Sequence, residues 1–320
     1  MSLPPLDPDA AKLLDLLAQV GVVPPHQQTP AAVRTQERRT LRTAPPPFVS
    51  VGEVRGIEGD WRGQPVRGRL YRPHGAAADA VLPGLVYFHG GGWVVGSLDT
   101  HDHLCRALCR QAGIAVFSVD YPLAPEAPFP AAVDGAVAGF AWAVENAGAL
   151  GMDPARIGAG GDSAGANLVA VLSLEARDLG GVPPRVQLLF YPAMDLTLGH
   201  LQHGNARPGD PFTPEAVAWF VDLYLGGADA ADWRASPLLA GSLAGLPPAY
   251  VMTAGADVLA GDGRAFAARL EEAGVPVRTR HFPGQIHAFL RSPHLLPTAW
   301  TAIADAAEFL SAELCGFDPA

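Results

Sequence analysis

The sequence alternates short apolar segments with longer stretches of helical pattern, and this alternation limits the possible folds more than any other feature. Apolar segments with the length of buried strands lie at 84–88, 114–119, 156–159, 186–191, 249–253 and 277–282. Helical patterns lie between and after them, at 98–112, 131–147, 164–179, 261–273 and 298–314. Strands that are apolar on both faces and are separated by helices are typical of a mostly parallel sheet covered on both sides. The sequence therefore predicts an α/β fold.

The N-terminal region follows a different pattern. Asp7-Pro8 and Thr29-Pro30 each place a capping residue before a proline, which predicts the start of a helix. The prolines at 45–47 then form a stiff break. After that break, the segments 48–57 and 66–71 predict two strands that pair antiparallel.

One connection is much longer than the others. Residues 192–248 separate two predicted strands and contain a helix that starts at Thr213-Pro214 and carries aromatic side chains. We expect this insertion to form a lid or a substrate pocket together with the N-terminal helices. The predicted division is therefore N-terminal helices that contribute to a cap (1–47), a catalytic domain (48–196 and 236–320) and a cap insertion (197–235). Four aromatic residues are predicted to line the pocket: Trp93, Trp219, Phe220 and Tyr224.

The segment Gly161 to Gly165 has the sequence G-D-S-A-G and lies between the apolar segment 156–159 and the helical stretch 164–179. It fits the G-x-S-x-G motif, in which a tight strand-to-helix turn exposes a serine and glycines avoid collisions across the turn. Free N–H groups at the start of the helix favour negative charge there. Ser163 is the predicted nucleophile, and an ordinary glycine-rich turn is the alternative.

A second glycine-rich segment, His89-Gly90-Gly91-Gly92-Trp93, directly follows the apolar segment 84–88. Consecutive glycines cost backbone entropy, so a fold keeps them where bare backbone must approach something closely. Beside a nucleophilic serine, the N–H groups of Gly91, Gly92 and Ala164 are the predicted donors to an oxyanion. A phosphate-binding loop is the alternative, but neither of its usual glycine motifs is present here.

A serine needs a base to remove its proton and a carboxylate to orient that base. His287 follows the predicted strand 277–282, and Asp257 follows the predicted strand 249–253. Both should emerge at the carboxyl edge of the parallel sheet, where Ser163 also emerges. The sequence therefore predicts a triad of Ser163, His287 and Asp257.

Other acids and histidines were weighed for these roles. Asp262 is expected to cap the next helix, and Asp195 follows another predicted strand. His281 lies within a predicted strand, and His294 follows a proline in a loop. The pairs at 101/103 and 200/203 lack further ligands at recognisable spacing, so we expect no metal site.

Charge and composition exclude several classes of protein. The sequence has 22 Lys and Arg against 32 Asp and Glu, a net charge of −10, which argues against binding nucleic acid. With 49% hydrophobic residues, the chain is not of the disordered class. The longest apolar stretch, 131–144, is too short to span a bilayer and contains Asp134.

A cluster of arginines and the cysteines are both expected to have structural roles. Arg34, Arg38, Arg39 and Arg42 share much of one predicted helix with Glu37, and we interpret them as a solvated helix face. Of the 3 cysteines, Cys105 and Cys109 are expected to pack in the core and Cys315 to be a tail thiol. Since residues 1–11 carry no secretory signal, a reducing cytoplasm is the expected compartment.

In combination, the motifs resemble those of the hormone-sensitive lipase family of α/β-hydrolases, the bacterial family IV esterases. The resemblance covers about residues 66–314 and rests on H-G-G-G-W at 89–93, Y-P-L-A-P-E at 121–126, G-D-S-A-G at 161–165, D-V-L at 257–259 and G-Q-I-H at 284–287. It implies an eight-stranded, mostly parallel sheet flanked by helices, with a helical cap. It also implies hydrolysis of short- to medium-chain carboxylic esters without a cofactor.

Some positions depart from the family pattern. Ala166 and Ala288 stand where glycines are usual, Pro122 replaces the arginine of Y-R-L-A-P-E, and Val258 replaces the proline of D-P-L. None of these changes removes a triad group. The lost arginine is expected to alter a structural ion pair near Glu126.

The sequence leaves three functions open. A serine carboxylesterase acting on small-molecule esters is the first hypothesis. An amidase or deacetylase would use the same triad, and a non-catalytic receptor of this fold would have lost part of it. The family resemblance also implies a homodimer paired through an edge strand.

Overall fold

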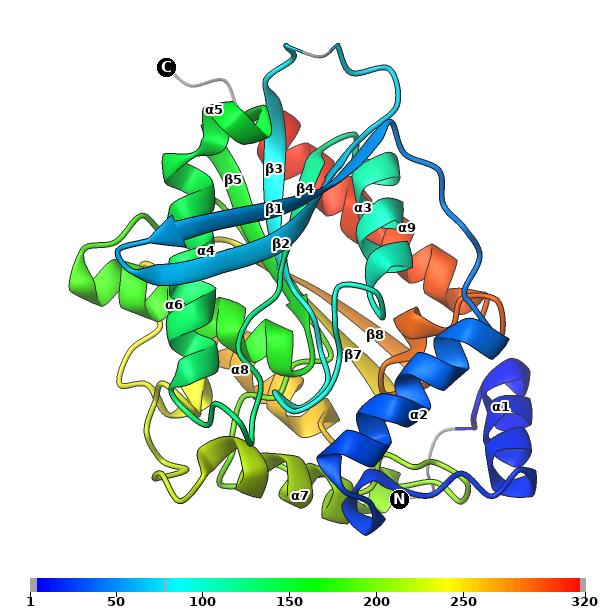
Figure 1. Ribbon diagram of the computed structural model, residues 1–320. Coiled ribbons are helices and arrows are strands. Elements are labelled where there is room, and N and C mark those ends of the chain that lie inside the picture. The colour runs from blue at the N-terminus through cyan, green and yellow to red at the C-terminus, as the bar shows by residue number, and fades with distance from the viewer. Residues whose placement is uncertain (1–4, 78, 317–320) are drawn as a thin grey trace.

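The computed structural model describes residues 5–77 and 79–316, and within them eight strands form one sheet (Figure 1). The strand order is β1-β2-β4-β3-β5-β6-β7-β8. The strands are β1 Glu53–Trp61, β2 Gln64–Arg72, β3 Leu82–Phe88, β4 Ala115–Val119, β5 Met152–Asp162, β6 Gln187–Phe190, β7 Ala249–Ala256 and β8 Val277–Ile286. The pairs β1/β2 and β2/β4 are antiparallel and the other pairs are parallel. The predicted α/β fold with a mostly parallel sheet is confirmed.

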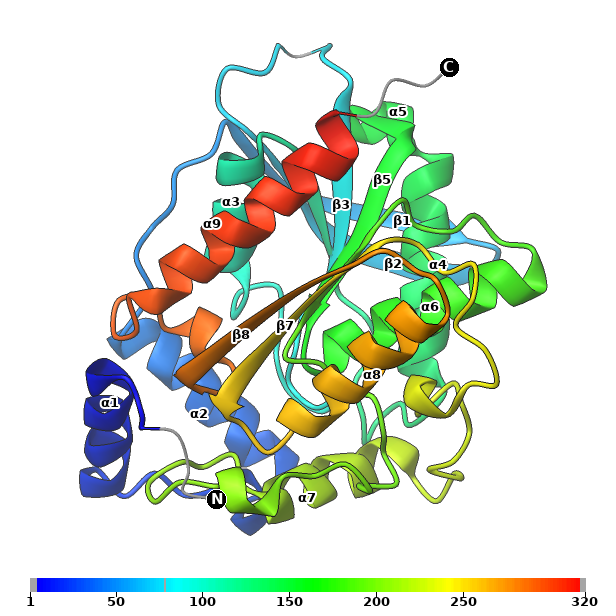
Figure 2. The same ribbon diagram turned by 180° about the vertical axis from the view of Figure 1, so that it is seen from behind.

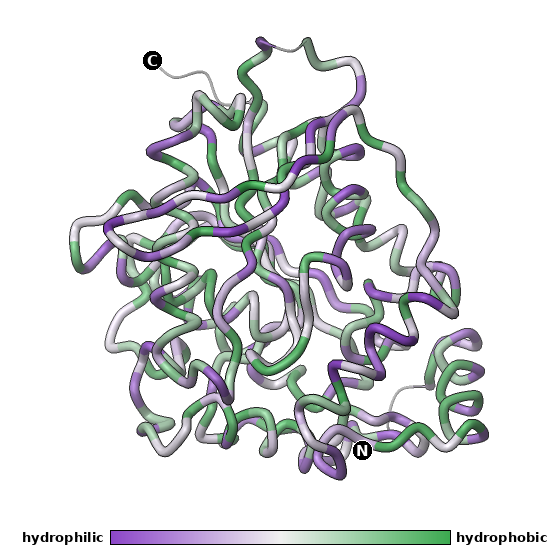
Figure 3. The backbone as a smooth tube through the Cα atoms, viewed as in Figure 1, coloured by the Kyte–Doolittle hydropathy of each residue, from purple (hydrophilic) through white to green (hydrophobic). Residues whose placement is uncertain are grey.

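Helices cover both faces of the sheet, as its apolar strands require (Figures 1 and 2). One face carries α3 Asp102–Ala112 and α9 Thr298–Leu310. The other face carries α4 Ala131–Glu145, the short α5 Ala147–Leu150, α6 Ala164–Leu179 and α8 Ala260–Glu272. The β1–β2 ribbon, by contrast, is hydrophilic over much of its length (Figure 3).

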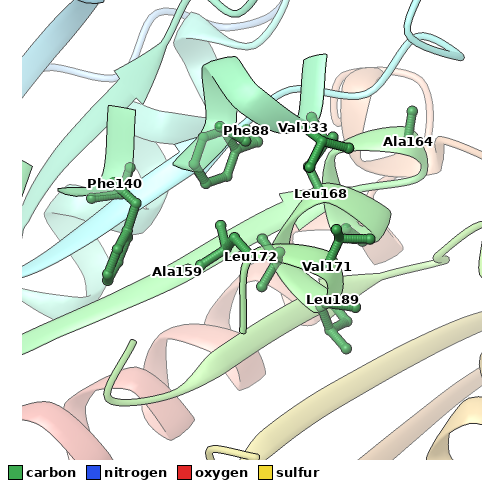
Figure 4. Close-up of a cluster of buried hydrophobic side chains, with 14 of the residues drawn as sticks. Phe88, Val133, Phe140, Ala159, Ala164, Leu168, Val171, Leu172 and Leu189 are labelled. Carbon is green, nitrogen blue, oxygen red and sulfur yellow. The ribbon is translucent and has the colours of Figure 1, made fainter. Parts of the chain in front are cut away.

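Helix α6 is the most deeply buried of these helices and supports the turn that begins it. Leu168 and Leu172 of α6 lie between the sheet and α4, close to Phe88 and Phe140 (Figure 4). The helix starts at Ala164, one residue after the predicted nucleophile, and ends before Gly180, which has a φ of 80°. Its bounds are those predicted from the sequence. A helix fixed on all sides gives the turn at its N-terminus a rigid base.

Three further helices lie together beyond the carboxyl ends of the parallel strands (Figures 1 and 2). They are α1 Pro8–Gln19, α2 Pro30–Thr43 and α7 Pro214–Leu225. Thr29 and Thr213 cap α2 and α7 as predicted, each accepting a bond from the N–H three residues on. Asp7 does not cap α1 with its side chain, because its carboxylate instead accepts a bond from Gln285 Nε2 at 2.7 Å.

The remaining short helices are η1 Pro25–Gln27, η2 His203–Asn205, η3 Pro237–Leu239, η4 Phe289–Arg291 and the π-helical η5 Ser311–Cys315. Within the described ranges, no helix combines the length and apolarity needed to cross a membrane. The cysteines lie as predicted, since Cys105 and Cys109 are buried and Cys315 is exposed, and all three are free thiols.

Several element boundaries differ from the prediction. The first strand begins at Glu53 instead of residue 48, since Phe48 is exposed and its ring packs against Arg106. Helix α3 begins at Asp102, because residues 97–100 form a turn in which Thr100 Oγ1 accepts a bond from the N–H of Ser97. Strand β8 continues past Pro283 to Ile286, which is possible because an edge strand tolerates a proline.

Candidate active site

Ser163 occupies the turn between β5 and α6. Its φ of 53° and ψ of −116° are strained for a residue with a side chain. A β-carbon at Gly165 would lie 2.0 Å from the carbonyl oxygen of Phe88, so only glycine permits this close approach. The N–H of Ser163 donates to the carbonyl of Phe190 at 2.8 Å. Packing from two neighbouring strands therefore holds the serine in the strained conformation.

The structure brings Ser163, His287 and Asp257 into one chain of hydrogen bonds. His287 Nε2 lies 3.0 Å from Ser163 Oγ, and His287 Nδ1 lies 2.8 Å from Asp257 Oδ2. Asp257 directly follows β7 and His287 directly follows β8, at the carboxyl edge predicted for both. All three side chains are buried or nearly so. An Nδ1–H donated to the carboxylate leaves Nε2 free to accept the serine proton.

Two aromatic rings hold the imidazole of His287. Phe212 stacks on it with a centroid separation of 3.9 Å and an interplanar angle of 9°. Tyr191 meets it edge-on at 5.0 Å. Phe212 belongs to the loop before α7, so the predicted cap insertion contacts the base directly. Phe212 could not be predicted from the sequence, because nothing local to residue 212 indicates a contact with residue 287.

The alternative acids and histidines take no part in this chain of hydrogen bonds. Asp262 does not cap α8, because its Oδ2 accepts the N–H groups of Met194 and Asp195 at 2.7 and 2.9 Å. Burial raises the pKa of Asp262 to about 7. Asp195 pairs with His200 at 2.8 Å, and His281 bonds to Thr253. In the described part of the chain, no group of three or more His, Cys, Asp or Glu could hold a metal ion.

The glycine-rich segment after β3 has the backbone conformations that its sequence suggested. Gly91 and Gly92 have φ values of 125° and 58°. A β-carbon at Gly91 would lie 2.2 Å from the carbonyl oxygen of Val95, and one at Gly92 would lie 2.4 Å from the ring of Phe220. Larger residues are therefore excluded at both positions.

Asp162, the residue before the nucleophile, ties this segment to the strand beneath it. Its Oδ1 accepts bonds from Gly90 N–H at 2.9 Å and from the Tyr87 hydroxyl at 2.8 Å, and Oδ2 lies 3.2 Å from His101 Nε2. Burial alone would raise the pKa of Asp162, but His101 and these hydrogen bonds hold it below its usual value. This role was not predicted from the sequence, although Asp162 lies inside the G-x-S-x-G motif.

Helix α2 contacts the same segment from the other side. Arg34 donates to the carbonyl oxygens of Val94 and Ala124, both at 2.8 Å, and forms a two-pronged ion pair with Glu126. The interpretation of Arg34 as part of a solvated face is therefore wrong, whereas Arg38, Arg39 and Arg42 are exposed. Glu126 has the structural ion pair expected of it, with an arginine from α2 as its partner. The Arg34 guanidinium lowers the pKa of Glu126 to about 2.

Glu37, one turn further along α2, links two parts of the site. Its carboxylate accepts the N–H of Gly96 at 3.0 Å and pairs with Arg291 at 2.8 Å. Arg291 lies in η4, shortly after His287. Burial would raise the pKa of Glu37, but Arg291 and the Gly96 N–H lower it. Helix α2 thus binds both the backbone that follows the glycine-rich segment and the loop that carries the base.

Two cavities meet at Ser163. The larger measures about 380 Å³, extends under α1 and α2, and includes His287 in its lining. The smaller measures about 20 Å³ and lies between the glycine-rich segment, α7 and the loop after β6. Both are lined by Gly92, Ser163, Phe212 and Phe220.

The predicted pocket aromatics have different positions. Phe220 lines both cavities, and Trp93 lines the smaller one. Tyr224 is fully buried and stacks on Trp93 at 4.3 Å, so it belongs to the core and not to the pocket lining. Trp219 packs edge-on against Phe220 at 4.9 Å, behind the ring that lines the cavities. The helical periodicity of α7 could not show that Phe220 lines the cavities while its neighbours Trp219 and Tyr224 do not.

Residues 85–291, more than half of the sequence, match the alpha/beta hydrolase fold family. The chain belongs to this family. Its motifs and relatives place it in the hormone-sensitive lipase branch, among the bacterial family IV esterases. The resemblance stated from the sequence is thereby confirmed.

Two relatives and one solved structure to which the chain is similar are named as ester hydrolases or esterases. The carboxylic ester hydrolase LipN of Mycobacterium tuberculosis is 47% identical over 69% of this chain, and the alignment spans only 60% of LipN. An arylesterase of Saccharolobus solfataricus is 35% identical over 90% of this chain and 94% of its own length. A thermostable esterase from Pseudomonas putida superposes with a TM-score of 0.92 at 33% identity, covering 98% of this chain and 99% of that one.

Proposed function

We propose that this carboxylic-ester hydrolase cleaves short- to medium-chain esters through an acyl-enzyme formed on Ser163. The observation that carries the proposal is the unbroken hydrogen-bond chain from Ser163 through His287 to Asp257 at the meeting point of two apolar cavities. The names of the relatives support ester hydrolysis. The receptor alternative has no support, because the three triad groups are present and in contact.

In the first half of the reaction, Ser163 Oγ attacks the ester carbonyl carbon while His287 Nε2 takes the hydroxyl proton. The imidazolium donates to Asp257 through Nδ1–H, and this carboxylate stabilises the new charge. The imidazolium then protonates the leaving alkoxide oxygen, the C–O bond breaks and the alcohol departs. In the second half, a water oxygen attacks the acyl carbon while His287 Nε2 takes a proton from that water. The bond between the acyl carbon and Ser163 Oγ then breaks, Ser163 Oγ takes the proton from His287, and the carboxylic acid leaves.

The tetrahedral intermediate carries a negative oxygen that needs donors. We assign this role to the backbone N–H groups of Gly91, Gly92 and Ala164. Ala164 lies at the N-terminus of α6, where the helix dipole favours negative charge. Loss of one such donor typically costs about 3 kcal/mol of transition-state stabilisation.

A cap over the site is part of the proposal. The N-terminal helices (1–47) and the insertion (197–235) would form it, over a catalytic domain of 48–196 and 236–320. Residues from α1, α2 and the loop before α7 line the larger cavity, which supports this division. A cap that limits access to the cavity restricts the size of the substrate.

Compartment and assembly are also proposed. The pair of buried free thiols, Cys105 and Cys109, fits the reducing cytoplasm, and fractionation of the native host tests this location.

Strand β8 lies at the edge of the sheet, which supports a homodimer paired along it. Light scattering at micromolar concentration should give twice the mass of one chain for that dimer, and the mass of one chain would contradict it.

The central experiment is Ser163→Ala. Removing the nucleophile should lower kcat on p-nitrophenyl acetate by on the order of 10⁵-fold, because triad members act as a unit. Wild-type protein should be labelled by a fluorophosphonate at Ser163, and the variant should not. A folded variant that keeps wild-type turnover would exclude the proposed nucleophile.

A further inference from the structure

The two cavities beside Ser163 differ both in size and in which reacting group they contain. The larger cavity, of about 380 Å³, includes His287 in its lining. The smaller, of about 20 Å³, is lined by Ser163 and Gly92 but not by His287. An ester bound at Ser163 has two arms, the acyl group and the alcohol, and each cavity can hold one of them.

The chemistry of the proposed function decides which arm lies where. His287 must protonate the leaving alcohol oxygen, so that oxygen and its substituent lie on the His287 side of the carbonyl carbon. The larger cavity is on that side. The acyl substituent therefore points to the other side of Ser163, into the smaller cavity.

The smaller cavity admits very little. At about 20 Å³, against about 380 Å³ for the larger cavity, it has room for only a small acyl substituent. Its walls include Trp93, Val217 and Val221, each at most 5% exposed. Trp93 is fixed by its stacking on Tyr224, so this wall cannot move aside easily. Long acyl chains would have to displace these packed side chains.

The polar groups at the cavities favour an uncharged substrate. Asp195 lines the smaller cavity, but its carboxylate is occupied by Thr197 and His200. In the larger cavity, Glu37 and Arg291 neutralise each other in an ion pair, and the carboxyl groups of Asp162 and Asp210, which also line it, disfavour an anionic substrate. The rest of that lining is mostly apolar, including Leu13, Leu17, Val22, Leu41 and Leu296.

We infer that the preferred substrates are acetyl esters of bulky, apolar alcohols, with the acetyl methyl group in the smaller cavity and the alcohol in the larger one. The inference rests on the proposed function, because it uses the position of His287 as the acid that protonates the leaving group. Both arms of the substrate are thereby specified, the acyl group and the class of the alcohol.

Two isomeric esters test the inference on the wild-type protein. Hexyl acetate and ethyl hexanoate have the same formula and leaving alcohols of similar acidity, so they differ only in which arm is long. We expect kcat/KM for hexyl acetate to exceed that for ethyl hexanoate by about tenfold or more. An equal or reversed ratio would overturn the assignment while leaving the esterase proposal intact. Failure to hydrolyse either ester, together with no fluorophosphonate labelling of Ser163, would remove the proposed function and this inference with it.

A pair of variants tests the wall itself. Val217 and Val221 lie one turn apart on α7 and line only the smaller of the two cavities. In the double variant Val217→Ala/Val221→Ala, kcat/KM for ethyl hexanoate relative to ethyl acetate should rise about tenfold. Leu223→Ala, on the same helix but outside both linings, is the matched control and should leave that ratio unchanged. If the folded double variant and the control had the same ratio of kcat/KM for ethyl hexanoate to kcat/KM for ethyl acetate, the acyl group would not lie in the smaller cavity.

Discussion

At the scale of single residues, the imidazole of His287 is positioned by a local turn as well as by its hydrogen bonds. Asp210 accepts the N–H of Phe212 at 2.9 Å, and this turn places the Phe212 ring on His287. Burial raises the pKa of Asp210 to about 6, while the nearby His287 acts to lower it. Above about pH 6, Asp210 therefore adds a negative charge beside the base.

This arrangement predicts a pH effect for Asp210→Asn. The amide oxygen can still accept the Phe212 N–H, so the ring should stay in place while the charge is lost. Because that charge stabilises the imidazolium, its removal should shift the acid limb of the kcat/KM profile to lower pH, by roughly half a unit. Rates on p-nitrophenyl acetate from pH 5 to 8 measure the shift.

Asp229→Asn provides the control for this prediction. Asp229 accepts the N–H of Ala231 in a similar turn, but on an exposed loop. Its variant should have the wild-type profile. Superimposable acid limbs for Asp210→Asn and wild type would show that Asp210 does not act on the base.

At the scale of elements, α2 does more than cover the cavity. Arg34 binds the backbone that follows the glycine-rich segment, and Glu37 binds Gly96 and Arg291. The arginine that the family motif places at position 122 is absent here, and Arg34 supplies the partner of Glu126 from a different element. Two parts of the site that are far apart in sequence are thus fixed by one helix.

The role of α2 predicts the effect of Arg34→Met. The variant keeps an apolar chain of similar length but loses the bonds to Val94 and Ala124 and the ion pair with Glu126. Since Arg34 contacts neither Ser163 nor His287, we expect kcat to fall about tenfold with KM nearly unchanged, through misplaced oxyanion donors. Steady-state kinetics and the melting temperature should be measured together.

Arg38→Met is the matched control on the same helix. Arg38 is exposed, and its side chain donates a local bond to Thr35 on the same helix. Both its kcat and its melting temperature should stay close to wild type. A rise in KM with unchanged kcat in Arg34→Met would show that Arg34 affects substrate access and does not position the oxyanion donors.

At the scale of the whole molecule, the features that could be predicted from the sequence are those set by local motifs and by the order of strands and helices. The bounds of α6 follow from the motif before it and from Gly180 after it. The contact set of Ser163, His287 and Asp257 follows from the rule that parallel strands end at one edge. Periodicity shows which residues share a helix face, but not what faces them, and for this reason Arg34, Tyr224 and Trp219 were misplaced. Spacing could not show that Asp262 binds the loop after β6.

Asp262 also makes the stability of the whole fold depend on pH. The carboxyl has an ordinary pKa of 3.8, which burial raises to about 7 in the folded protein. Between these values the folded state holds a proton that the unfolded state has lost, so the free energy of unfolding falls as pH rises. The stabilisation is complete below about pH 3.8 and is lost as pH rises through about 7.

Asp262→Asn should remove this dependence. The amide oxygen can accept the N–H groups of Met194 and Asp195, and an amide does not titrate in this range. From pH 5 to 8 the variant should become more stable relative to wild type, by on the order of 2 kcal/mol, as measured by chemical denaturation. Asp15→Asn, on the exposed side of α1, removes one charge without touching the core and controls for net charge. If the unfolding free energies of Asp262→Asn and wild type ran parallel across this pH range, the carboxyl would already be ionised in the folded state at pH 5, and the bonds from Met194 and Asp195 would suffice to hold a buried charge.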